Sequence, residues 1–319
     1  MKLKEIRGFF KVVLILTLTT LLMLGGVSCK PPQEAPGETV TFTDALGREV
    51  KAPKSPQRVA ALLGSFADVW MLSGGSLSAA AEDAWEDFEL EMGDAVNLGG
   101  AHSPNLELLL SANPDFVIAS ASTASHLEML ETLDAMGIAV AYFDVDNFED
   151  YLSMLDICTD LTGRKELYEI NGLKLAEQIE KVKDEYADAP AVEKRVLLLR
   201  ASSGFVKVKG SRGTILGEML ADMGCINIAD AEESLLENLS VEAVIKEQPY
   251  HIFVVAMGSN LDAARASFEN LLLENPAWSG LDAVRENRIH WMEKRLFNLK
   301  PNARWAEAYE VLYEKLAAD

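Results

Sequence analysis

The stretch from residue 105 to residue 120 reads NLELLLSANPDFVIAS and contains the pattern on which much of the chain is built. Asn105 is suited to cap a helix, the residues after it form a short helical pattern, and Asn113-Pro114 ends that helix. The apolar run at residues 115–120 then predicts a buried strand. A second stretch, residues 240–256, reads SVEAVIKEQPYHIFVVA and repeats the order of cap, glutamate, proline and apolar strand. The recurrence indicates two related halves.

Helices and strands alternate on both sides of these stretches. We expect further strands at residues 58–63, 138–144, 195–200 and 288–292, and further helices at 125–136, 214–223 and 302–316. Two short alternating runs, residues 39–44 and 48–52, predict a hairpin. The expected fold class is therefore α/β, with two Rossmann-like lobes, each a mostly parallel sheet flanked by helices.

A long helix is expected between the two halves. Residues 164–187 contain no proline and one glycine, Gly172, and a helix of that length would extend roughly 36 Å. Such a helix is long enough to bridge two lobes. We therefore expect an N-terminal lobe at residues 40–163, a bridging helix at 164–187 and a C-terminal lobe at 188–319.

The N-terminal segment has the pattern of an export signal. Four basic residues within positions 2–11 precede the uncharged run at 12–24, which is short for a membrane-spanning helix. Small residues before Cys29 resemble a bacterial lipobox, although Gly26 stands where leucine is usual. We expect a lipoprotein signal peptide at residues 1–28, then the lipidated Cys29 and a flexible, proline-rich tether at 29–39. The alternative is a plain signal with an unrelated cysteine.

The composition excludes several classes of protein. The 319 residues include 29 Lys and Arg against 50 Asp and Glu, a net charge of −21, so binding to nucleic acid through phosphate contacts is not expected. Three cysteines do not form a disulfide scaffold. The chain contains no G-x-S-x-G, P-loop, H-E-x-x-H or G-x-G-x-x-G motif. A binding protein is therefore favoured over an enzyme, with an exported α/β enzyme or a surface sensor as alternatives.

Six short segments occur in an order and spacing typical of one known family. They are DALGREV at 44–50, PQRVA at 56–60, NLE at 105–107, NPDFVI at 113–118, GCINIA at 224–229 and PNAR at 301–304. Over residues 40–317, the chain resembles the substrate-binding lipoproteins of ABC importers for ferric siderophores, haem and cobalamin. The resemblance implies two α/β lobes joined by one rigid helix, with the ligand held between the lobes.

Glu107 and Glu242 are the candidate docking residues. From charge alone, each is an acid in the first turn of a helix, where it complements the helix dipole. The resemblance implies more, because in that family one exposed glutamate on each lobe pairs with arginines of the membrane permease. We expect both residues to dock to an ABC permease, a transmembrane dimer that works with an ATPase.

Candidate ligand-binding cations lie in two windows without acids. The first window runs from Arg200 to Arg212 and includes Lys209, and the second, residues 294–304, includes Arg295. Both windows follow predicted strands, whose carboxyl ends bind ligands in open α/β sheets. Cations there would suit an anionic chelate, since arginine binds carboxylates in a fork. The alternative is pairing with surface acids.

Further candidates for the cleft are Ser65, Phe66, His102, Ser122 and Phe297. The two phenylalanines could form apolar walls, although core packing is the commoner role of an aromatic side chain. A bare-metal site would need three or four converging ligands, and only His102 and His126 lie near the expected cleft. His102 could also take the place of a haem-binding tyrosine, although a solvated histidine is the simpler interpretation.

Together these features predict an extracytoplasmic, lipid-anchored monomer that binds a small-molecule metal chelate, and the ligand that we expect is a ferric siderophore. Haem, cobalamin and a bare metal are alternative ligands. We expect no intrinsic cofactor, no metal site, no catalytic residue and no contact with the membrane except through the lipid.

Overall fold

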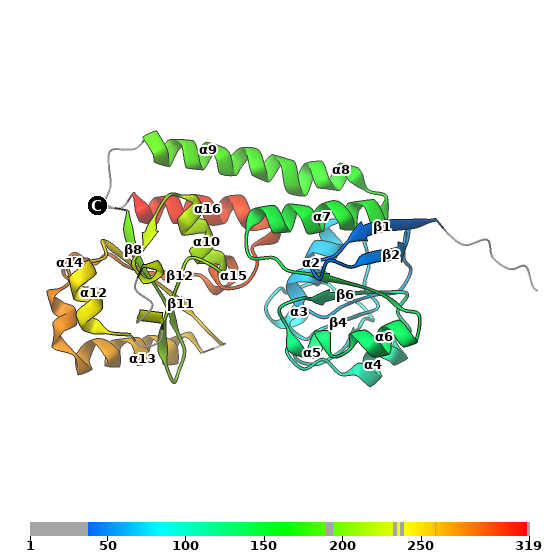
Figure 1. The fold of residues 1–319 in the computed structure, drawn as a ribbon, viewed down its shortest axis with the longest axis horizontal. Helices are drawn as coiled ribbons and strands as arrows, with labels where there is room; N and C mark the ends of the chain where they lie inside the picture. Colours follow the sequence, from blue (N-terminus) through cyan, green and yellow to red (C-terminus); the bar gives the residue numbers. More distant parts are fainter. Residues whose placement is uncertain (1–37, 189–193, 232–234, 237–238, 259, 318–319) are drawn as a thin grey trace, which may run out of the picture. The chain divides into compact units, whose positions relative to one another are not determined.

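The computed structural model describes residues 38–188, 194–231, 235–236, 239–258 and 260–317 (Figure 1). Residues Thr39–Asp319 form one compact unit. The predicted signal peptide, Cys29 and tether lie almost wholly outside the described residues. This unit contains both predicted lobes.

A hairpin and a five-stranded sheet form the first half of this unit. The hairpin pairs β1 (Thr39–Thr43) with β2 (Glu49–Pro53), as the sequence predicts. The sheet has the order β5-β4-β3-β6-β7, and every neighbouring pair is parallel. Its strands are β3 (Val59–Ala61), β4 (Ala79–Ala80), β5 (Val96–Asn97), β6 (Phe116–Ser120) and β7 (Ala139–Phe143).

Short helices connect these strands. Apolar and helix-forming residues between turn glycines produce α2 (Gly64–Leu72), α3 (Asp83–Glu86), α4 (Leu106–Ser111), α5 (Ala124–Leu127) and α6 (Leu130–Ala135). The helix predicted at residues 125–136 is therefore two helices, because the chain breaks at Glu128 and Met129. Gly137, with φ of 69°, stops the second of them in the left-handed conformation that glycine adopts without strain.

The second half contains a sheet of similar design. Its parallel strands have the order β10-β8-β11-β12, and β9 pairs antiparallel with β8. The strands are β8 (Arg195–Ala201), β9 (Val206–Lys209), β10 (Ile226–Asn227), β11 (His251–Ala256) and β12 (Ile289–Met292). The helical segments are α10 (Ile215–Asp222), η2 (Ile228–Asp230), α12 (Val241–Glu247), α13 (Leu261–Glu274), η3 (Pro276–Gly280), α14 (Asp282–Arg285), α15 (Lys294–Phe297), η4 (Asn302–Arg304) and α16 (Trp305–Leu316).

Long helices join the two halves. After α7 (Phe148–Thr162), the chain turns at Gly163 and runs without interruption through α8 (Lys165–Tyr168), the π-helical turn η1 (Glu169–Leu173) and α9 (Lys174–Asp188). Figure 1 shows this run extending from the first half to the second, which confirms the expected bridging helix. The hydroxyl of Tyr151, in α7, donates a hydrogen bond of 2.7 Å to the carbonyl of Asn171 in the π-helical turn of this run.

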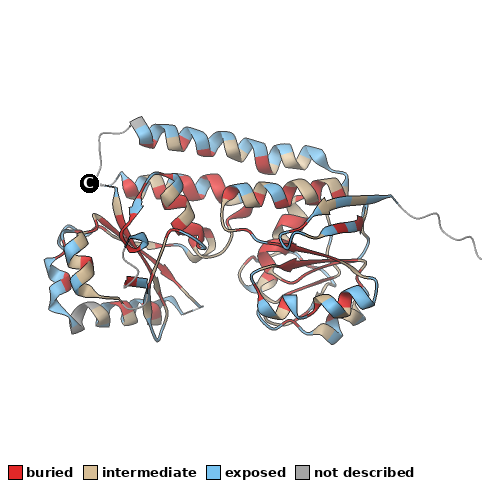
Figure 2. Ribbon diagram, in the orientation of Figure 1, coloured by how far each residue is buried: buried red, intermediate tan, exposed pale blue. Residues whose placement is uncertain are grey.

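One hydrophobic core continues through both halves. It contains one face of each sheet together with α2, α7, α9, α10 and α16. Trp305 of α16 lies 5.8 Å from the Phe148 ring of α7, edge to face. Figure 2 shows buried residues along both α7 and α16. The opposite faces of the sheets have separate cores. The shared core limits the independent movement of the lobes, since close-packed interiors deform little.

Candidate functional site

The candidate site is the edge at which the parallel strands of each sheet end. In the first sheet, Ser65 follows β3, His102 follows β5 and Ser122 follows β6. In the second sheet, Arg200 lies near the end of β8 and Arg295 follows β12. Open α/β sheets bind ligands at this edge because the connecting loops and helix N-termini converge there.

Three cations share one face of the β8–β9 hairpin. The register pairs Arg200 with Lys207 and Leu198 with Lys209, so alternation places all three charged side chains on the same face. Strand β9 was not predicted, and it converts part of the first basic window into a compact cluster. We call Arg200, Lys207 and Lys209 the hairpin cations.

The hairpin cations have no acidic partner among the residues that the structure describes. The structure gives neither Arg200 nor Lys209 a side-chain hydrogen bond or ion pair with any described residue, and Lys207 lies over the Phe205 ring at 5.2 Å. Burial lowers the pKa of the Arg200 guanidinium. Burial also lowers the pKa of Lys209, and the positive charges of Arg200 and Lys207 lower it further. Two half-buried cations of like charge, Arg200 and Lys209, are unfavourable as neighbours in the ligand-free protein.

A small cavity lies against the hairpin cations. Its volume is about 10 Å³, close to that of one water molecule, and its lining includes Arg200, Lys209, Thr214 and Phe297. Phe297 is 2% exposed, so it forms an apolar wall beneath the charged groups. The structure thus brings together three predicted site residues from two separate parts of the chain.

The other predicted cations have partners. Arg212 Nη1 lies 2.8 Å from Glu218 Oε2 at the surface. In the second basic window, both arginines and Lys294 form ion pairs with acidic side chains. These pairs are Lys294–Asp87 at 2.5 Å, Arg295–Asp68 at 3.1 Å, Arg304–Glu293 at 3.3 Å and Arg304–Glu307 at 2.7 Å. Only the first window therefore leaves neighbouring cations unpaired among the described contacts.

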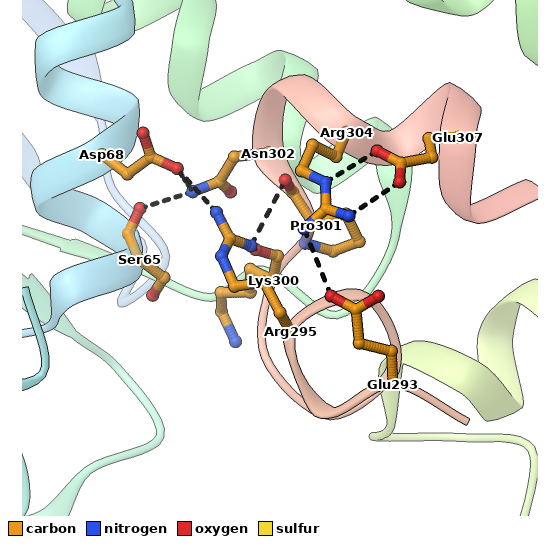
Figure 3. A network of polar contacts seen from close by, with 9 residues as sticks. All are labelled: Ser65, Asp68, Glu293, Arg295, Lys300, Pro301, Asn302, Arg304 and Glu307. Carbon is orange, nitrogen blue, oxygen red and sulfur yellow. Dashed lines mark hydrogen bonds and ion pairs between the residues drawn. The ribbon is translucent and has the colours of Figure 1, made fainter. Parts of the chain in front are cut away.

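Ser65 and Arg295 lie in a contact between the halves, shown in Figure 3. The side-chain amide of Asn302 donates hydrogen bonds of 2.9 Å to the carbonyl of Ser65 and to Asp68 Oδ2. Arg295 Nη2 donates to the same Asp68 oxygen at 3.1 Å. Sequence reasoning missed this network, because Asp68 and Arg295 lie 227 residues apart and no spacing rule links them.

Phe66 is 1% exposed and packs edge to face against Phe143, at 6.2 Å between ring centroids. It is therefore a core residue in this structure, the commoner role of an aromatic side chain. Ser122 is exposed, and its hydroxyl lies 3.0 Å from that of Ser120 at the end of β6.

The two histidines of the first half have different environments. His126 is fully buried, where Nδ1 accepts a hydrogen bond of 3.1 Å from the Ser120 amide and Nε2 lies 2.7 Å from the Ala101 carbonyl. Both ring nitrogens are occupied, so His126 fixes the loops after β5 and β6. His102 is exposed. The described part of the chain contains no group of three or more side chains arranged to hold a metal ion.

Glu107 and Glu242 occupy equivalent positions on α4 and α12. Asn105 Oδ1 accepts from the Leu108 amide at 3.0 Å, and Ser240 Oγ accepts from the Ala243 amide at 3.3 Å. Each cap leaves its glutamate exposed in the first helical turn. Neither carboxylate has an ion pair with any residue that the structure describes.

Comparison with known proteins places this geometry in context. The family model described as "Periplasmic binding protein" matches residues 59–296. Among curated protein sequences, none is significantly similar to the chain. The described residues contain no helix with the length and hydropathy of a membrane span.

Several solved structures have the same fold. Staphylococcus aureus SirA complexed with staphyloferrin B superimposes with a TM-score of 0.69 and 20% identity, covering 88% of this chain and 99% of SirA. S. aureus IsdE complexed with haem gives 0.65 and 15%, covering 82% of this chain and 99% of IsdE. The vitamin B12 binding protein BtuF of Vibrio cholerae gives 0.66 and 17%, covering 83% and 98%. At these identities, the likeness shows the fold.

Proposed function

The chain belongs to the periplasmic binding protein family, and we propose that it captures an anionic ferric siderophore between its lobes and delivers it to an ABC permease. Proteins of this family bind substrates outside the cytoplasm and pass them to such a permease. The observation that carries the proposal is the group of hairpin cations. A ligand with carboxylate or catecholate groups would supply the negative charges that Arg200 and Lys209 lack.

The charge balance of the protein strengthens this argument. Acids outnumber bases by 21, yet three neighbouring cations on one hairpin have no acidic partner among the described contacts. Such an arrangement costs stability in the free protein and favours an anion on binding. The similar structures include complexes with staphyloferrin B and with haem, which supports an iron-containing ligand.

Delivery requires attachment and docking. We propose that Cys29, released by removal of residues 1–28, carries a lipid that anchors a monomeric protein to the membrane through the tether. Glu107 and Glu242 would then pair with cations of the permease. Their exposure and their equivalent helical positions support this role. Exposed pairs are weak and screened by salt, so they would orient the protein more than they would hold it.

A ligand panel tests the proposal directly. Residues 30–319 would be melted with ferric catecholates, ferric hydroxamates, ferric citrate, haem, cobalamin and free divalent metals. A ligand present at 100 times its dissociation constant stabilises by about 2.7 kcal/mol, a shift of several degrees. We expect a shift with an anionic ferric chelate that disappears in Arg200→Met and persists in the control Arg212→Met. A shift with cobalamin or a free metal alone would contradict the proposal.

Haem is a second candidate, favoured by the exposed imidazole of His102 beside the expected cleft. Histidine nitrogen is a common axial ligand of haem iron. A haem-dependent absorbance change that is lost in His102→Ala and retained in Arg200→Met would establish this candidate instead.

A further inference from the structure

Asp68 and Arg295 connect a helix of the first half to the segment that follows the last strand of the second. Their side chains are 15% and 19% exposed, and Arg295 Nη2 lies 3.1 Å from Asp68 Oδ2. Arg295 also donates through Nη1 to the Lys300 carbonyl at 2.6 Å, and its guanidinium lies 4.1 Å from the centroid of the Phe88 ring. The guanidinium is therefore fixed by three contacts, of which Figure 3 shows those with Asp68 and Lys300.

Asn302 holds the same segment against α2. It is fully buried and has φ of 55°, a left-handed conformation that costs free energy in any residue with a side chain. Its amide donates to both Ser65 O and Asp68 Oδ2, contacts that fix this conformation. The strained turn therefore presents one amide to two acceptors on the opposite half.

Lys294, which precedes Arg295 in the sequence, contacts a second helix of the first half. Lys294 Nζ lies 2.5 Å from Asp87 Oδ1, at the end of α3. Residues 294 and 295 thus bind two successive helices of the first half, although they follow β12 of the second. This connection is separate from the bridging helix and resists rotation about it.

We infer that Asp68 and Arg295 are positioning residues, which fix the spacing between the hairpin cations and the loops after β5 and β6 before a ligand arrives. The inference rests on the proposed function, because it concerns how that site is arranged. A bridging helix with a π-helical turn leaves one axis about which the halves can tilt. The cross-link removes that freedom, and a preformed site binds more tightly because less ordering is needed on capture.

Distance measurements on the ligand-free protein test this inference. Spin labels would be attached to Glu128→Cys and Asp262→Cys, two exposed positions on opposite halves, in residues 30–319. The two described native cysteines, Cys158 and Cys225, are buried. We expect a narrow distance distribution in the otherwise unchanged protein and a broadened one in Asp68→Ala and Arg295→Ala. The control is Arg304→Ala, because its partners Glu293 and Glu307 lie on the same half.

Two further measurements separate positioning from simple loss of folding. The conservative variant Arg295→Lys keeps a positively charged donor beside Asp68 and should retain a narrow distribution, and all variants should keep a cooperative melting transition. With the ferric chelate that stabilises the unchanged protein, Asp68→Ala and Arg295→Ala should bind about tenfold more weakly if about a tenth of the molecules keep the competent spacing. Unchanged distances, or unchanged affinity, in both of these variants would overturn the inference. Failure of every chelate to bind would contradict the proposed function and leave the distance result standing.

Discussion

His251 and His290 share a hydrogen bond between neighbouring parallel strands, with 2.9 Å between His251 Nδ1 and His290 Nε2. His251 is fully buried against the rings of Tyr250 and Phe253. Burial lowers the pKa of both histidines to about 4, and the charge of Arg288 acts on both in the same direction. His290 also lowers the pKa of His251, and Lys315 lowers that of His290.

The histidine pair predicts a loss of stability in mild acid. An unfolded histidine has a pKa of about 6.5, so between that value and about pH 4 the unfolded chain binds more protons than the folded one. The free energy of unfolding therefore falls as the pH is lowered from 6.5 to about 4, by up to about 3 kcal/mol for one ring. Urea unfolding from pH 4 to 7.5 would measure it.

Two variants isolate the effect from the titration of carboxylates. The double variant His251→Gln with His290→Gln should lose much of the slope of stability against pH between 6.5 and 4. The control His102→Gln, at an exposed position, should retain it. An equal slope in all three proteins would show that the pair does not cause the acid sensitivity.

Removing the charge of Arg200 should raise the stability of the ligand-free protein. Its guanidinium is half buried, has no acidic partner in the described part of the chain and lies near Lys209, whose pKa it lowers. Arg200→Met keeps the apolar stem and removes the charge, so we expect the ligand-free protein to be more stable by about 0.5 kcal/mol. Chemical denaturation would measure the change, with Arg212→Met as the control at a surface ion pair. If Arg200→Met is less stable, the guanidinium stabilises the fold of the free protein, which would contradict its role as an unpaired group that binds an anion.

The sequence predicted those elements whose limits are set locally. The capped helix and the apolar strand expected within residues 240–256 are α12 and β11 in the structure, because Ser240 caps the helix and the proline before the strand separates two apolar patterns. Strand β9 was missed, since its alternation of valine and lysine is too short to indicate a strand before β8 is there to pair with it.

The candidate site was predictable to a similar extent. The strand-end positions of Arg200 and Ser122 follow from the alternation of elements, but the partners of Arg295 do not. Arg295 contacts Asp68 only because the chain returns to α2 after the second sheet is complete. Local patterns therefore locate a basic residue near the cleft, whereas long-range packing decides whether it remains unpaired or joins the two halves.

Glu107 and Glu242 predict a transport defect without a binding defect. Both carboxylates are exposed on opposite halves, so Glu107→Gln and Glu242→Gln should leave the ligand affinity unchanged. Each substitution removes a favourable interaction with a helix dipole, which costs about 0.3–1 kcal/mol. Uptake in cells that contain the permease should fall in each variant and fall further in the double variant. The control is Glu131→Gln, another acid in a first helical turn, and an equal loss of uptake there would contradict a specific docking role.

Position 64, at the start of α2, has no room for a side chain. A Cβ atom at this position would lie 2.5 Å from the Ala84 amide nitrogen and 2.6 Å from the Asp83 carbonyl carbon, both backbone atoms that cannot rotate away. Gly64→Ala should therefore lower the free energy of unfolding by about 2 kcal/mol, because α3 must shift away from α2. Since α2 also carries Asp68, the same shift should broaden the distance distribution between the halves. The control Gly204→Ala meets no atom within 4 Å and should change the melting temperature little. Equal melting temperatures for the two variants would show that α2 and α3 are not held at the spacing seen here.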